Sequence, residues 1–111
     1  MPAIDNSTFE ELKQMSGADF INELIDAFLE DAPHMILNMR IALDGKDVES
    51  FRRNAHSLKS NAQTFGATEL AALARELELM GKEKKLDVGD RLKVLVTSFE
   101  KVAEELKGLR V

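Results

Sequence analysis

The 111-residue sequence has no cysteine, tryptophan or tyrosine and only two prolines. Without cysteine there are no disulfides, thiolate metal sites or cysteine nucleophiles. Acidic residues outnumber basic ones 20 to 15, for a net charge of −5, and no basic stripe interleaved with aromatics is present, so nucleic acid is not an expected partner. No apolar run approaches the roughly 18 residues of a membrane span. Acidic residues also come early, so we expect no signal peptide, no membrane contact and a cytoplasmic location.

What the sequence does contain favours helices. Hydrophobic residues make up 44% and charged residues 32% of the chain, which is typical of a compact globular protein and not of a disordered one. Leucine, alanine, glutamate and lysine are abundant and are good helix formers. The length suits one domain, so we expect residues 1–111 to form a single helical domain whose first few residues are a frayed tail.

The N-terminal third contains apolar residues at helical spacing, interrupted by one proline. We expect a short helical piece near residues 9–15. Ser16 and Asp19 resemble a capping box and predict the start of a longer helix. This helix should end by Ala32, because Pro33 disfavours helical geometry in the residue before it.

The rest of the chain predicts further helices with clear boundaries. Pro33 fits the first turn of a helix, Gly45 and Gly66 are natural helix stops, and Asp47 can cap the helix between them. Short connections make consecutive helices antiparallel. The expected fold is all-α, an antiparallel four-helix bundle with one or two additional short N-terminal helices. The apolar stripes are wider than a coiled-coil seam, which favours a monomer. The expected ranges are 33–45, 47–66, 70–81 and 88–109.

His56 lies on the exposed face of the central helix. The apolar face of this helix consists of Phe51, Ala55, Leu58, Ala62 and Phe65. His56 lies roughly 140° from the centre of that stripe. An exposed imidazole beside cations is suited to handling phosphate. Its helical neighbours are Arg52, Arg53, Lys59, Ser60 and Gln63.

The residues around His56 resemble the motif of the histidine-containing phosphotransfer (HPt) domain family. In that motif the histidine is followed by an apolar residue two positions on, a lysine three on, a small residue four on and a glycine ten on. Ser60 is a departure, because glycine is commoner there, but serine is also small. The segment 29–33 resembles the helix junction upstream in these domains. The matching residues are Ala55, His56, Leu58, Lys59, Ser60, Ala62, Gly66, Leu70, Leu77 and Glu78.

The resemblance implies a phosphorelay intermediate of multistep two-component signalling. His56 would accept a phosphoryl group from one receiver-domain aspartate and pass it to another. The implied partners are receiver domains of response regulators or hybrid histidine kinases. No carboxylate cluster surrounds His56, so we expect no metal or cofactor in this chain and a Mg²⁺ ion supplied by the partner. We expect no kinase or hydrolase activity.

The neighbours of His56 have candidate roles in this chemistry. Near neutral pH an exposed imidazole is largely unprotonated and nucleophilic. Lys59, on the same face, can stabilise phosphate charge. The small side chain of Ser60 leaves room for a partner to approach His56. Arg52, Arg53 and Gln63 are candidate partner contacts, although exposure alone also explains them.

Glu78 is a candidate for orienting the imidazole. It lies roughly 90° from the apolar stripe of its helix, at the boundary of the core. His56 comes ten residues before Gly66 and Glu78 twelve after it, so an antiparallel hairpin brings them to similar height. A carboxylate there can accept a hydrogen bond from Nδ1–H and leave Nε2 free to attack phosphorus. An ordinary exposed glutamate is the alternative.

Two other classes of protein fit parts of the sequence. A helical adaptor would have an incidental surface histidine and carry no phosphate. The phosphoacceptor and dimerisation domain of a histidine kinase would use ATP, but the sequence has no glycine-rich phosphate loop and little room for an ATP-binding domain.

Overall fold

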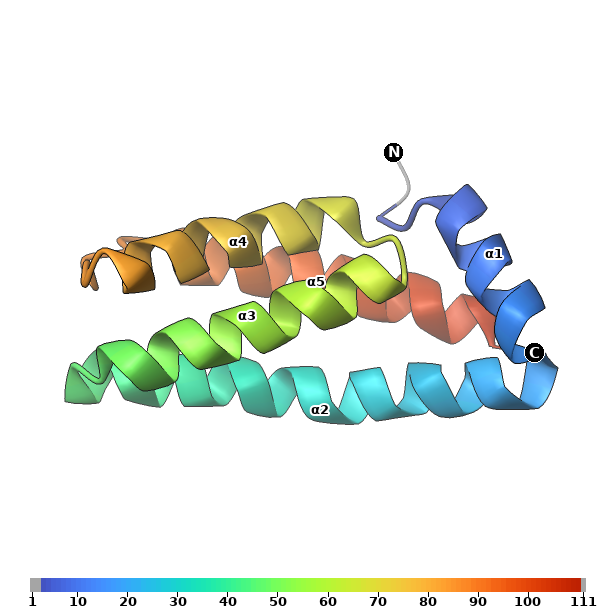
Figure 1. The fold of residues 1–111 in the computed structure, drawn as a ribbon, viewed down its shortest axis with the longest axis horizontal. Coiled ribbons are helices and arrows are strands. Elements are labelled where there is room, and N and C mark those ends of the chain that lie inside the picture. The colour runs from blue at the N-terminus through green and yellow to red at the C-terminus, as the bar shows by residue number, and fades with distance from the viewer. Residues whose placement is uncertain (1–2, 111) are drawn as a thin grey trace.

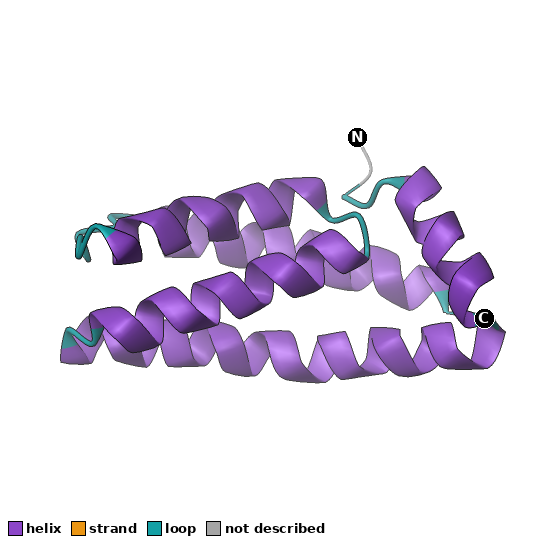
Figure 2. Ribbon diagram, in the orientation of Figure 1, coloured by secondary structure: helices purple, strands orange, loops and turns teal. Residues whose placement is uncertain are grey.

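The computed structural model describes residues 3–110, and within that range every regular element is an α-helix. The long helices α2 to α5 run alongside one another as an antiparallel four-helix bundle, and α1 crosses one end of it, near the end of α5 (Figures 1 and 2). The predicted all-α bundle is confirmed, with one additional N-terminal helix. No helix in the described range is long and apolar enough to cross a membrane. The helices are α1 (Asn6–Ser16), α2 (Ala18–Gly45), α3 (Val48–Thr64), α4 (Thr68–Lys82) and α5 (Arg91–Leu109).

The apolar stripes of the four long helices meet along the bundle axis. Phe28 of α2 packs against Phe65 after α3 and Phe99 of α5, with ring centroids 5.2 and 5.8 Å away. This burial fixes the rotation of each helix about its axis, so the residues opposite each stripe are held at the surface. Fully buried members include Phe51, Leu58, Leu70, Leu77, Leu95 and Leu106.

The expected break at Pro33 is wrong, because α2 continues through it. Ala32 and Ile36 are both buried, so the apolar face is unbroken across the proline. Pro33 itself is exposed, and the carbonyl of Leu29 that loses its N–H partner is left for water. Packing of the continuous stripe therefore outweighs the local preference of the residue before proline.

The expected capping box is also wrong. Ser16 is the last residue of α1, and Gly17, with φ of 83°, joins α1 to α2. Within the described range no side chain caps the start of α2. Glycine accepts this positive φ without strain, so the chain turns there directly from one helix into the next.

The expected frayed tail is wrong for residues 3–5, while residues 1 and 2 lie outside the described range. Ile4 is fully buried, and the backbone N–H of Ala3 donates to Glu105 of α5 at 2.7 Å. The N–H of Asp5 donates to the carbonyl of Gly66 at 2.8 Å. The N-terminal segment therefore ties the α3–α4 turn to the end of α5.

The ends of α3 agree with the sequence. The side chain of Asp47 accepts a hydrogen bond from Ser50 N–H at 3.1 Å and caps the helix. Gly66, with φ of 77°, follows its C-terminal end. The last helix begins at Arg91 and not at Val88, which is buried in the preceding loop.

Gly81 allows α3 and α4 to pack closely. A Cβ atom at this position would lie 3.1 Å from Cβ and 3.2 Å from Cα of Arg52. Those separations are shorter than ordinary van der Waals contact, so the two helices meet here with no side chain between them. Glu78 lies on α4 one turn before this point, where a side chain can reach across to α3.

Candidate functional site

His56 stands on the outer face of α3 with its ring turned toward α4. Its neighbours Ala55 and Leu58 are buried, whereas the His56 side chain is 55% exposed. Its Nδ1 atom lies 2.7 Å from Oε2 of Glu78. The structure thus contains the hydrogen bond between His56 and Glu78 that the sequence analysis considered. Nε2 is the ring nitrogen that takes no part in this hydrogen bond.

Glu78 is a buried carboxylate with both oxygens occupied. The residue is only 3% exposed, so it lies deeper than the core boundary where the helical angle placed it. Oε2 contacts His56, and Oε1 lies 2.7 Å from Nζ of Lys59, whose side chain is 19% exposed. Because both partners come from α3 and cover the carboxylate, Glu78 is shielded from solvent.

The surroundings of Glu78 determine its ionisation. Burial alone raises the pKa of a carboxyl group, but the hydrogen bonds from Lys59 and His56 outweigh it and hold the pKa of Glu78 below its usual value. Glu78 is therefore a carboxylate near neutral pH. A carboxylate can only accept hydrogen bonds, so the neutral imidazole must donate through Nδ1–H and keep its lone pair on Nε2.

The pair between Lys59 and Glu78 was not anticipated from the sequence. Lys59 was expected as a cation beside His56, and it is instead partly buried with its ammonium group on the carboxylate. The signal was present, because residues three apart on one helix share a face and both can reach the same residue on a facing helix. The sequence did not show how deeply the Glu78 side chain is buried.

The candidate partner-binding residues differ in whether they already contact other side chains of the chain. Arg52 donates from Nε to Oε2 of Glu49 at 3.2 Å and makes a second contact with the same carboxylate, and Arg53 lies 3.9 Å from it. Part of their charge is therefore neutralised within α3. Ser60 and Gln63 are exposed on the same helix. Within residues 3–110 there is no cluster of three or more histidine, cysteine or acidic side chains suited to a metal.

Comparison with known proteins agrees with this geometry. The family model described as "Hpt domain" matches residues 23–110, a range that includes His56, Lys59 and Glu78. The chain therefore belongs to the Hpt domain family.

Two individual proteins are similar to the chain. Multistep phosphorelay regulator 1 of Schizosaccharomyces pombe is 25% identical over 87 residues, which cover 76% of this chain and 30% of that protein. The chain thus spans about a third of the length of this relative. The crystal structure of histidine-containing phosphotransfer protein B (HptB) from Pseudomonas aeruginosa PAO1 superimposes with a TM-score of 0.92, covering 98% of this chain and 95% of that one at 24% identity. That likeness extends the agreement to the whole fold, α1 included.

Proposed function

We propose that His56 is the phosphoacceptor and that Nε2 is the atom that carries the phosphoryl group. The observation that supports this is the 2.7 Å hydrogen bond between Nδ1 and the buried Glu78 carboxylate. It fixes the tautomer in which Nε2 has a free lone pair. An exposed histidine without such a partner would have no preferred nucleophilic nitrogen.

The phosphoryl transfer step requires few side chains of this protein. The Nε2 lone pair attacks the phosphorus of a receiver acyl phosphate, the bond from phosphorus to the aspartate oxygen breaks, and the free carboxylate leaves with that electron pair. Nδ1 keeps its proton, so positive charge develops on the ring. The Glu78 carboxylate lies against that proton and stabilises the charge. In the reverse direction the same charge makes the imidazole a good leaving group.

Lys59 is placed to act on the phosphoryl group after transfer. Its ammonium lies on Oε1 of Glu78, one helical turn from His56. We propose that it binds phosphoryl oxygens once they arrive at Nε2, because a phosphoryl group carries more negative charge than the shared carboxylate. Phosphoryl transfer depends mainly on positioning and charge stabilisation, and these three side chains supply both.

The remaining requirements are assigned to the partner. We propose receiver domains of response regulators or hybrid histidine kinases as partners, and the Mg²⁺ of the reaction as a ligand of the receiver. Among residues 3–110 the only carboxylate on His56 is Glu78, and both of its oxygens are engaged. The chain would act as a monomeric cytoplasmic carrier without kinase or hydrolase activity of its own.

The experiment is incubation of the chain with a panel of ³²P-labelled receiver domains. We expect label on the wild type that is labile in acid and stable in base, as for a phosphoramidate. His56→Gln should take up none while keeping the helical circular dichroism spectrum. Undiminished labelling of that variant would remove His56 from the mechanism.

Two controls separate the other classes of protein. His34, also exposed, lies on α2, so His34→Gln should label like the wild type. Incubation with labelled ATP alone should leave the chain unlabelled, and labelling there would indicate a kinase. A helical adaptor predicts no label with any receiver.

A further inference from the structure

The reactive face of α3 is turned toward α4. His56 and Lys59 both contact Glu78 of α4, so the two side chains that define the site lie along the seam between these helices. A partner that reaches Nε2 must therefore cover part of α4 as well as α3. The partner contacts predicted from the sequence all lie on α3.

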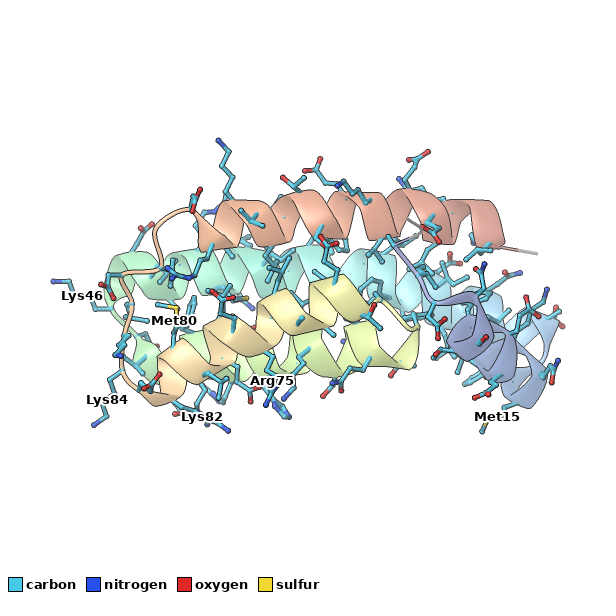
Figure 3. All side chains as sticks on the ribbon, turned by 90° about the horizontal axis from the view of Figure 1, so that it is seen from above. Met15, Lys46, Arg75, Met80, Lys82 and Lys84 are labelled. Atoms are coloured by element: carbon cyan, nitrogen blue, oxygen red, sulfur yellow. The ribbon has the colours of Figure 1, made fainter. Side chains whose placement is uncertain are left out.

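Arg75 lies beside this seam, one helical turn before Glu78. In Figure 3 its side chain extends from α4 on the side away from α5. Arg75 is exposed and makes no hydrogen bond or ion pair with any residue of the described range, in contrast to Arg52, which is bound to Glu49. A guanidinium held at a surface without a partner has its full donor set available.

Two shallow hollows adjoin Arg75. One, of about 290 Å³, is lined also by Gln63 and the α3–α4 turn. The other, of about 320 Å³, lies along the outer face of α4 and is lined also by Leu79. Leu79 directly follows Glu78 in the chain and is 44% exposed. Arginine is enriched at the centres of protein interfaces, and Leu79 adds exposed apolar surface beside it.

The α2 side of His56 is less suited to a partner. There Asn38 of α2 donates to Asn54 of α3 at 3.3 Å, which covers the seam with polar groups that already pair. The exposed aromatic of α2, Phe20, is 18 residues from Asn38, so it lies about 27 Å away along the helix. Leu37 and Ile41 of α2 are also exposed, at 51% and 59%. The α4 side is therefore favoured by Arg75 and by the contacts of His56 and Lys59 with Glu78.

We propose that the receiver domain docks over α4, with Arg75 binding a carboxylate of the receiver and Leu79 forming the apolar contact. This inference rests on the proposed phosphoacceptor role of His56. The surface is continuous with the His56 site. Arg75 complements the receiver, whose phosphorylatable aspartate and Mg²⁺ ligands make its reactive edge acidic. The two glutamates that also line the hollow along the outer face of α4, Glu76 and Glu83, are paired with Arg91 and Lys85.

The experiment measures the transfer rate as a function of receiver concentration, which separates the apparent Kd from the maximal rate. For Arg75→Glu we expect the apparent Kd to rise about tenfold and its salt dependence to weaken, with a maximal rate near that of the wild type. Leu79→Ser should raise the apparent Kd about threefold to tenfold at unchanged salt dependence. Both variants must still accept label on His56.

Matched substitutions on α2 serve as controls. Arg40 is exposed and unpaired within the described range, and Leu37 is 51% exposed, so Arg40→Glu and Leu37→Ser make the same chemical changes beside the α2–α5 groove. We expect both to transfer like the wild type. An Arg75→Glu variant that behaves like Arg40→Glu would overturn the proposal, and so would a loss of affinity in Phe20→Ser with none in Leu79→Ser. Failure of the phosphoacceptor role is distinct, because it would appear as label on His56→Gln.

Discussion

At the scale of residues, three side chains from two helices form one charge network. A buried carboxylate loses much hydration energy and is kept ionised only by close partners. Glu78 has two, the Lys59 ammonium and His56 Nδ1, each at 2.7 Å. The same contacts that keep Glu78 charged also orient the imidazole, so structure and chemistry at this site depend on one carboxylate.

Replacing Glu78 with glutamine tests the orienting role at nearly constant shape. The amide can donate to Nδ1 and so favours the tautomer protonated on Nε2, which has no lone pair for attack. We expect phosphoryl uptake by Glu78→Gln to slow about tenfold without being abolished. Two-bond ¹⁵N–¹H correlation spectra of His56 should show a larger fraction of the Nε2-protonated tautomer. Wild-type kinetics together with a wild-type tautomer ratio would contradict this role.

Lys59→Met is the companion variant for that measurement. It removes the cation and leaves the carboxylate on Nδ1. It should slow uptake while the tautomer of His56 stays as in the wild type. The pair of variants therefore separates charge stabilisation from orientation.

At the scale of elements, α2 shows a proline accommodated inside a helix. Pro33 is exposed, whereas the stripe through Ala32 and Ile36 is buried, so the helix keeps its core contacts and loses one backbone hydrogen bond on the solvent side. The long α2 spans the bundle and gives α3 a continuous surface to pack against.

Pro33→Ala should stabilise the protein. It restores the N–H donor to the Leu29 carbonyl, and the gain is partly offset by the greater entropy of the unfolded chain. We expect the free energy of unfolding to rise by about 1–2 kcal/mol, measured by urea denaturation at unchanged m-value. Glu30→Ala, an exposed substitution in the same helix, should change it by less than about 0.5 kcal/mol. A less stable Pro33→Ala would show that the proline ring makes contacts that the helix needs.

Gly81→Val tests the close approach of α3 and α4. A side chain there meets the backbone of Arg52, so we expect a loss of about 1–3 kcal/mol in the free energy of unfolding and slower phosphoryl uptake as Glu78 moves away from His56. Gly108→Val is the matched control, because Gly108 is also helical but no neighbouring atom of residues 3–110 lies within 4 Å of its Cβ position. Equal effects at the two glycines would argue against a packing role for Gly81.

At the scale of the whole molecule, the sequence is informative about the bundle and less so about its ends. Helical periodicity identified the stripes of α3, α4 and α5, because burial against neighbours follows from spacing alone. It could not decide whether α2 breaks at Pro33, since that depends on packing by distant residues such as Phe65 and Phe99. The burial of Ile4 likewise depends on a contact between Ala3 and Glu105, at opposite ends of the chain.

The candidate site, too, could be predicted from the sequence only in part. The antiparallel hairpin indicated that Glu78 lies at a height similar to that of His56, with an ordinary exposed glutamate as the alternative. The depth of Glu78 and its pair with Lys59 required the actual separation of α3 and α4, which Gly81 sets. Arg75 was not singled out because its significance lies in what surrounds it, two hollows and no ion pair.

The pH dependence of unfolding reports on the whole network. The pKa of Glu78 is held below its ordinary value of 4.5 in the folded protein, so its carboxylate contributes stability that is complete above about pH 4.5 and is lost as the pH falls through the lower folded value. Glu78→Gln has no such titration. The stability advantage of the wild type over this variant should therefore shrink steadily below pH 4.5, as the protonated acid becomes comparable to the amide.

The comparison isolates Glu78 from other acids. Asp5 and Glu49 also have lowered pKa values, Asp5 mainly through the Thr8 hydroxyl and Glu49 mainly through Arg52, but they are present in both proteins and cancel in the difference. The measurement is urea unfolding of both proteins at intervals from pH 5 down to about pH 2.5. A difference that stays constant or widens on acidification would show that Glu78 is not held ionised by Lys59 and His56, and the fixed tautomer on which attack by Nε2 depends would lose its cause.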